Sequence, residues 1–113
     1  MMPTSLTLDT ARDDDGQLVL IAAGEIDLSN IDAFDQALAT ATTEAADKGE
    51  TLTVDLTAVE YLDSAAINAL FTHADHIHLI AHPVLMPVFT ISGLSELVII
   101  ESVLPQQTDA APD

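Results

Sequence analysis

The chain has 113 residues, which is enough for one domain built around a single hydrophobic core. It contains no cysteine, so disulfides, thiolate metal sites and cysteine nucleophiles are excluded. Nineteen acidic residues stand against only Arg12 and Lys48. A surface of this charge repels phosphate, which excludes nucleic acid as a direct partner. The same charge would steer a basic partner protein towards the chain. The alternative is that the acidic residues only keep the protein soluble.

The sequence predicts neither a leader peptide nor a membrane segment. Residues 1–5 lack the basic and apolar regions of a signal peptide. No apolar run reaches the length of about 18 residues that a membrane span needs. We therefore expect a cytoplasmic protein that has no membrane partner.

The first part of the chain predicts a β-hairpin followed by a helix. Two stretches rich in β-formers, 6–10 and 18–23, flank an Asp-rich turn that ends in glycine. Helical periodicity then runs over residues 30–47. Ser29 or Asn30 is expected to cap this helix by accepting a backbone N–H with its side chain.

From residue 52 onwards, predicted strands and helices alternate. Residues 52–57 predict a strand, and a loop over 58–63 leads to a helix that Ser64 opens. The remaining expected elements are a strand at 78–81, a helix from Pro83 to Gly93, and a strand at 97–100.

This order of elements predicts an α/β fold. We expect a mixed, mostly parallel sheet of about five strands, with three to four helices packed on it. A single domain is expected over residues 1–104. Residues 105–113 are expected to form a flexible tail that is acidic and rich in alanine.

Three short motifs stand near the ends of the predicted strands and helices. They are Gly24-Glu25-Ile26-Asp27, residues 54–67, and residues 82–94. The first is similar to the Gly-Glu-Leu-Asp of the STAS domain family, and the second to that family's strand, loop and Asp-Ser helix start. The third resembles its Ser-Pro and Thr/Ser-Gly-Leu pattern. Over roughly residues 6–103 the chain therefore resembles the bacterial anti-sigma factor antagonists of this family.

The resemblance implies a binding module that is not an enzyme and needs no cofactor. In the family, a partner anti-sigma kinase phosphorylates the serine that follows the motif's Asp, which here is Ser64 after Asp63. The unphosphorylated form binds the anti-sigma factor and frees the sigma factor, whereas the phosphorylated form releases the anti-sigma factor. The expected partner is therefore an anti-sigma factor with a serine kinase fold, which brings its own ATP and Mg²⁺. The expected partner-binding residues are Glu25, Asp27, Ser29, Asn30, Leu62, Asp63, Ser64, Ala65 and Ala66.

The position of Ser64 suits a phosphorylation switch on physical grounds too. A helix N-terminus favours negative charge and offers unpaired N–H groups. A phosphate adds about −1.5 to −2 charges there, which would repel acidic groups of a partner without refolding the domain. The alternative is that Ser64 only caps its helix, a role worth about 0.5–2 kcal/mol.

Two residues beside Ser64 depart from the family's usual pattern. Ala66 stands where many members carry glycine, and its methyl group is expected to narrow the approach of a kinase loop. Ala65 replaces a frequent second hydroxyl. Further along, Pro87 falls inside the third expected helix, where its missing N–H would kink the helix or delay its start. These departures indicate a divergent member, with altered partner choice or without kinase regulation.

Two clusters of polar residues invite a chemical interpretation. The first cluster is His73, Asp75, His76, His78 and His82, and histidine is a common ligand of zinc and nickel. The cluster crosses from a helix end into a strand, so we expect no metal site. Asp27, Asp55 and Asp63 are expected near strand ends, where α/β folds place sites. No nucleophile–base pair or cationic anchor accompanies them, so solvated carboxylates are the simpler interpretation.

Three other functions remain open at this point. The chain is alternatively a divergent STAS scaffold or a small-ligand-binding module without kinase regulation, and a more distant alternative is a small enzyme. A deep apolar pocket would favour ligand binding, and a convergent carboxylate site with bound metal would favour the enzyme. We expect a monomer or weak dimer.

Overall fold

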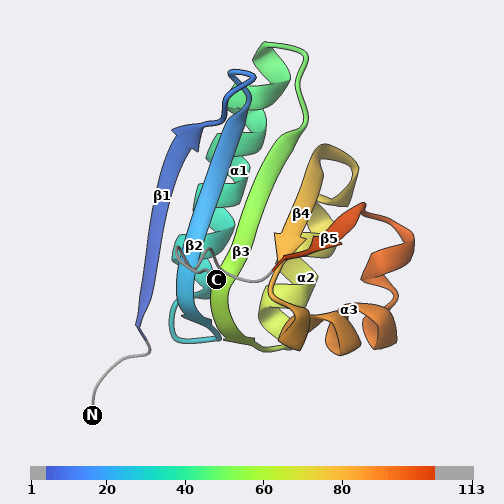
Figure 1. Ribbon diagram of the computed structural model, residues 1–113. Coiled ribbons are helices and arrows are strands. Elements are labelled where there is room, and N and C mark those ends of the chain that lie inside the picture. The colour runs from blue at the N-terminus through green and yellow to red at the C-terminus, as the bar shows by residue number, and fades with distance from the viewer. Residues whose placement is uncertain (1–4, 104–113) are drawn as a thin grey trace, which may run out of the picture.

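In the computed structural model, which describes residues 5–103, five strands form one sheet in the order β1-β2-β3-β4-β5 (Figure 1). β1 pairs antiparallel with β2, and all other pairs are parallel. The expected α/β fold with a mixed five-stranded sheet is confirmed. The strands are β1 (Leu6–Arg12), β2 (Leu18–Ile26), β3 (Leu52–Leu62), β4 (Ile77–Ala81) and β5 (Ile100–Ser102). The helices are α1 (Ile31–Asp47), α2 (Ser64–Thr72) and α3 (Met86–Ser92), with 3₁₀ turns η1 (Ala74–His76), η2 (Pro83–Leu85) and η3 (Leu94–Glu96).

The core lies between the sheet and the helices α1 and α2, which pass behind the sheet in Figure 1. Every second residue of the three central strands faces the helices and is buried. These residues are Leu18, Leu20 and Ala22 on β2, Leu52, Val54 and Leu56 on β3, and Ile77, Leu79 and Ala81 on β4. From α1, Phe34 and Leu38 are fully buried against them. The residues between, such as Ile21, Asp55 and Ile80, are half-buried on the other face.

The third strand is longer than the sequence pattern indicates. The expected loop over 58–63 is wrong, because β3 continues to Leu62. Its second half pairs with the end of β2, from Ala23 beside Ala58 to Ile26 beside Leu62, with register shifts on the way. Pairing with a neighbouring strand therefore decides the conformation of a segment whose apolar and polar residues do not alternate.

The third helix and the last strand both begin later than expected. Pro87 stands in the first turn of α3, where a missing N–H costs no hydrogen bond, and a 3₁₀ turn precedes the helix. It therefore delays the start of the α-helix. The last strand begins at Ile100 and not at residue 97, because the turn η3 draws in Leu97, whose N–H donates to the Leu94 carbonyl at 2.9 Å.

Other expectations hold or lie outside the described residues. The hairpin of β1 and β2 is confirmed, and the helix expected over 30–47 is observed as Ile31–Asp47. The boundary expected at residue 104 and the tail at 105–113 lie outside the residues that the structure describes.

Candidate functional site

The parallel pairing of β2 and β3 brings two of the sequence motifs together. Ile26, in the Gly-Glu-Ile-Asp motif, lies beside Leu62, which precedes Asp63 and Ser64. The backbone N–H of Asp63 donates to the Ile26 carbonyl at 3.1 Å. The carboxyl ends of two neighbouring strands and the start of α2 therefore form one site, at the lower end of the sheet in Figure 1.

Asp63, and not Ser64, is the N-cap of α2. Its backbone is extended, with φ −105° and ψ −172°, and Oδ1 accepts the N–H groups of Ala65 at 2.9 Å and Ala66 at 3.2 Å. Its other oxygen, Oδ2, accepts the N–H of Leu28 at 3.2 Å. One carboxylate therefore fixes the start of α2 and ties it to the turn that follows β2. The alternative in which Ser64 caps the helix is wrong.

Ser64 is the first residue of α2 and is exposed. Within residues 5–103 its hydroxyl group makes no hydrogen bond. The expectation that free N–H groups would hold a phosphate here needs correction, because the N–H groups of Ala65 and Ala66 already bind Asp63. A phosphate on Ser64 would instead project into solvent next to a carboxylate.

The turn between β2 and α1 is held by its own polar side chains. Asp27 Oδ1 accepts both the N–H of Ser29 at 2.9 Å and its hydroxyl at 2.6 Å. Asn30 occupies the N-cap position of α1, but its side chain does not cap the helix. Instead it accepts the N–H of Asp27 at 3.0 Å and donates to the Glu25 carbonyl at 2.9 Å. Glu25 itself is exposed.

The apolar residues expected at the site lie at different depths. Ala66 is fully buried and Leu62 is 6% exposed. Both side chains therefore lie in the core and support the surface residues of the site. Ala65 is half-buried. Because the methyl group of Ala66 points into the core, it does not narrow the outer approach to Ser64. The substitution of the family's usual glycine therefore leaves that approach open.

Two exposed apolar side chains beside these residues gave no clear signal in the sequence. Leu28 lies within the polar turn after β2 and is 77% exposed. Tyr61 is 50% exposed and lies beside Glu25 across the β2–β3 pair. The run Asp-Leu-Ser-Asn does contain one indication of Leu28, because turns of this kind are otherwise polar and a leucine there is exposed.

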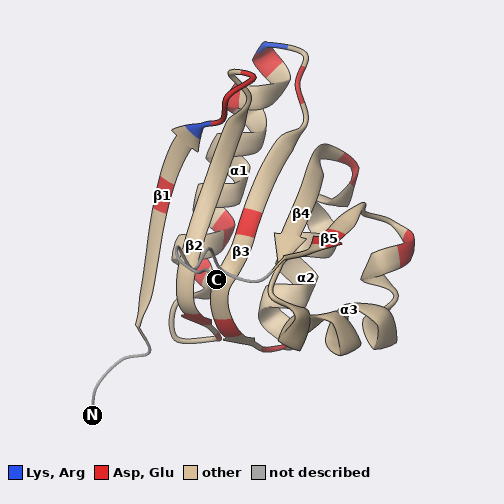
Figure 2. Cartoon of the chain, viewed as in Figure 1, with Lys and Arg blue, Asp and Glu red and all other residues tan. Residues whose placement is uncertain are grey.

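The two cationic residues lie at one end of the molecule, whereas Asp and Glu occur at both ends and along the strands (Figure 2). Arg12 binds the Gly16 carbonyl at 2.8 Å and Glu44 at 3.3 Å, and Lys48 follows α1 at the same end. β3 has 11 residues, so it separates this end from Ser64 by about 35 Å. The chain has no other Lys or Arg. The Ser64 end therefore carries carboxylates without any cationic residue.

The histidines have separate surroundings. The Nε2 of His73 lies 3.4 Å from Asp35 on α1, and the Nδ1 of His82 accepts the N–H of Val84 at 2.9 Å. In the described part of the chain, no group of three His, Cys, Asp or Glu side chains is placed to hold a metal ion. Asp55 lies in the middle of β3, not near a strand end, and accepts the N–H and hydroxyl of Thr57.

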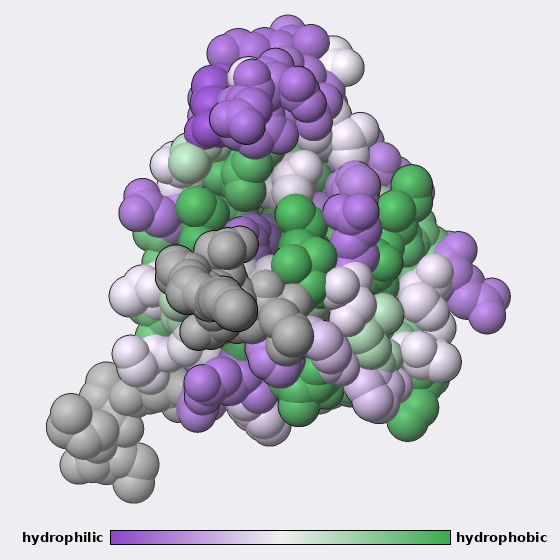
Figure 3. All heavy atoms as spheres, in the orientation of Figure 1, coloured by the Kyte–Doolittle hydropathy of each residue, from purple (hydrophilic) through white to green (hydrophobic). Residues whose placement is uncertain are grey.

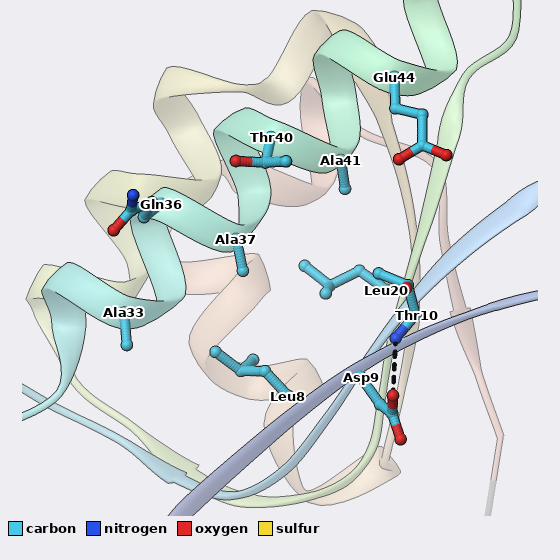
Figure 4. Close-up of a pocket in the computed structure, with 10 residues that line it drawn as sticks. All are labelled: Leu8, Asp9, Thr10, Leu20, Ala33, Gln36, Ala37, Thr40, Ala41 and Glu44. Atoms are coloured by element: carbon cyan, nitrogen blue, oxygen red, sulfur yellow. Dashed lines mark hydrogen bonds between the residues drawn. The ribbon is translucent and has the colours of Figure 1, made fainter.

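A groove of about 510 Å³ lies between α1 and the edge of the sheet (Figure 4). Leu8 and Leu20 form its floor against the small side chains of Ala33, Ala37 and Ala41, and Asp9 and Glu44 stand at its sides. It is open to solvent and its neighbouring carboxylates repel anions, so it does not suit a nucleotide or an anionic lipid. Among residues 5–103, no helix is long and apolar enough to cross a membrane.

Comparison with known proteins agrees with this geometry. A family model described as Mlab, STAS domain, matches residues 10–100. The chain is similar to the crystal structure of an anti-sigma factor antagonist from Mycobacterium paratuberculosis, with 27% identity, a TM-score of 0.77 and 91% of each chain covered. The anti-sigma factor antagonist SpoIIAA in its unphosphorylated form is 16% identical, with a TM-score of 0.64 over 85% of this chain and 89% of that one, and shows the same fold. No curated protein sequence matches the chain.

Proposed function

Because the chain belongs to the STAS domain family, we propose that it is an anti-sigma factor antagonist controlled by phosphorylation of Ser64. In its unphosphorylated form it binds an anti-sigma factor with a serine kinase fold and thereby releases a sigma factor. It acts by binding in the cytoplasm and catalyses no reaction itself. The likeness to the antagonist from Mycobacterium paratuberculosis supports this function.

One observation carries the proposal: Ser64 is exposed at the start of α2 while Asp63 performs the capping. Because the Ser64 hydroxyl makes no hydrogen bond within residues 5–103, its modification breaks none of the hydrogen bonds that hold the described fold. The phosphate adds about −1.5 to −2 charges at the centre of the contact surface. Placing like charges together across an interface costs several kcal/mol, so phosphorylation releases a partner that presents acidic groups there.

The surface around Ser64 also supports a partner of defined chemistry. Leu28 and Tyr61 offer exposed apolar side chains, with Asp27 next to Leu28 in the chain and Glu25 beside Tyr61 across the β2–β3 pair. A partner with an apolar pocket complements these two side chains. Ser29 and Ala65 complete the accessible part, whereas Leu62, Ala66 and the hydrogen bonds of Asn30 and Asp63 hold it in shape.

The proposal is tested by affinity capture from a native lysate with the wild-type chain, Ser64→Asp and Ser95→Asp. Ser95 is an exposed serine in η3, so its variant carries the same substitution away from the site. We expect the wild type and Ser95→Asp to retain an anti-sigma kinase and Ser64→Asp to lose it. Mass spectrometry should find phosphate on Ser64. Capture of the kinase by none of the three, with Ser64 always unmodified, would favour the alternative of a scaffold without kinase regulation.

A further inference from the structure

The outer edge of β1 offers backbone groups for pairing with another strand. Within residues 5–103, β1 pairs only with β2, and it lies at the margin of the sheet in Figure 1. The Ser5 carbonyl accepts the N–H of Glu25 at 3.0 Å, and the N–H of Asp13 donates to the Gln17 carbonyl at 3.0 Å. Since every second residue of an antiparallel pair bonds across it, the odd-numbered residues of β1 bond to β2. The N–H and C=O groups of its even-numbered residues therefore point away from the sheet. These residues are Leu6, Leu8, Thr10 and Arg12.

The surroundings of Thr10 agree with this assignment. Its N–H donates to Oδ1 of Asp9 at 3.2 Å, and not to a carbonyl of β2. Both residues are exposed. An edge strand with outward backbone groups is a template on which a further strand can form. The edge of β1 therefore has the property that strand addition requires.

The groove of Figure 4 runs along this free edge and has room for side chains of an added strand. Leu8 and Leu20 form its floor, and on its other side Ala33, Ala37 and Ala41 present only methyl groups. The spacing of four residues places these alanines in one row along α1. Directly opposite residues of paired strands point to the same face of a sheet. A residue opposite Leu8 would therefore direct its side chain into the groove, where an apolar side chain fits.

Carboxylates at the groove determine the charge of the segment that it suits. Asp9 lines it from β1 and Glu44 from α1, and both are exposed. Arg12, the cation at this end of β1, already binds Glu44 and the Gly16 carbonyl. A net charge of −17 attracts a basic segment and repels a second copy of the chain. We propose that an extended basic segment of another protein adds antiparallel to β1, with apolar side chains in the groove and Lys or Arg beside Asp9.

A peptide in which lysine and valine alternate, beginning and ending with lysine, tests this docking. It has seven residues, as β1 does. Its binding to the full chain is measured by fluorescence anisotropy in about 0.15 M NaCl, where salt screens the attraction between distant exposed charges. We expect saturable binding of one peptide per chain. A peptide with glutamate in place of each lysine should bind at least about tenfold more weakly.

Methylation of the peptide backbone separates strand pairing from attraction by charge. In the proposed arrangement the valines lie opposite the even-numbered residues of β1, so their N–H groups donate to it, whereas the lysine N–H groups point away. N-methylation of the three valines should therefore raise the dissociation constant at least about tenfold. N-methylation of three lysines should leave it within about twofold, although both peptides carry the same charge.

Substitutions in β1 test the same contact from the side of the protein. Thr10→Pro removes an outward N–H and should weaken binding at least about fivefold, whereas Thr10→Val keeps that N–H and should leave binding within about twofold. Neither substitution changes the net charge. Asp9→Asn should weaken binding about threefold. Asp14→Asn, at an exposed position of the hairpin turn, removes the same charge and should have a smaller effect.

Two results would overturn the strand-addition proposal. The first is equal binding of the valine-methylated and the lysine-methylated peptides, since charge alone would then explain their affinity. The second is the absence of saturable binding up to about 1 mM peptide. Both results come from the unaltered chain, so they do not depend on the folding of any variant. None of these measurements involves Ser64 or an anti-sigma factor, so their failure would leave the proposed function standing.

Discussion

Replacing Asp63 by alanine should destabilise the domain more than any other single carboxylate removal that leaves the core intact. The side chain accepts three backbone N–H groups, from Ala65, Ala66 and Leu28. Loss of an N-cap costs about 0.5–2 kcal/mol, and the separate bond to Leu28 adds about 1 kcal/mol. The free energy of unfolding should therefore fall by about 1.5–3 kcal/mol, and the melting temperature by about 6–12 °C for a domain of this size.

Urea unfolding followed by circular dichroism measures this loss directly. Asp63→Asn keeps an oxygen acceptor and should lose about half as much, because the bonds remain while the charge is gone. Asp75→Ala is the matched control, since Asp75 is an exposed carboxylate in η1 and its removal should cost less than about 0.5 kcal/mol. Equal midpoints for Asp63→Ala and Asp75→Ala would refute the claim that Asp63 holds the site together.

Two further substitutions separate the fold from the binding surface. Gly24 has φ +110°, and a Cβ there would meet the Ser5 carbonyl oxygen, so Gly24→Ala should lower the free energy of unfolding by at least about 2 kcal/mol in the same urea assay. A loss below about 0.5 kcal/mol would show that the β1–β2 edge adapts freely. Leu28→Ser should leave stability within about 0.5 kcal/mol but weaken partner binding at least about tenfold by calorimetric titration. Leu97→Ser, at another exposed leucine, should leave binding unchanged, and equal effects of the two would remove Leu28 from the interface.

The parts of the fold that follow local rules could be predicted from the sequence. The apolar face of α1, from Phe34 to Ala45, is buried as its spacing indicates. The proximity of the Gly24–Asp27 motif to Ser64 could be predicted as well, because the carboxyl ends of neighbouring parallel strands meet at one edge of a sheet. The sequence therefore indicated the location of Ser64 correctly.

The finer geometry depended on contacts between distant segments. Asp and Ser are both good N-caps, and the choice between Asp63 and Ser64 is made by the backbone, since a cap residue must be extended and Asp63 is. The extension of β3 to Leu62 depends on its pairing with β2. The side chain of Asn30 bonds to the backbone of Asp27 and Glu25 and does not cap its own helix, which no local pattern indicates.

The proposed phosphorylation switch also differs from the one that a helix N-terminus suggests by itself. A helix start favours a phosphate through its free N–H groups, but Asp63 occupies two of them and both cations lie at the opposite end of the molecule. We therefore propose that phosphorylation of Ser64 acts on the bound partner, because it would change the charge of the surface and leave the packing of the domain as it is.

The central claim is tested most directly by incubating the purified chain with its captured kinase partner, ATP and Mg²⁺, and then measuring both the modified residue and the affinity. We predict one phosphate per chain, on Ser64, and a dissociation constant raised about a hundredfold, as like charges meet at the interface. The Ser64→Ala chain should accept no phosphate and keep its affinity. Phosphate on a different residue, or a chain phosphorylated on Ser64 that binds as tightly as before, would contradict the account.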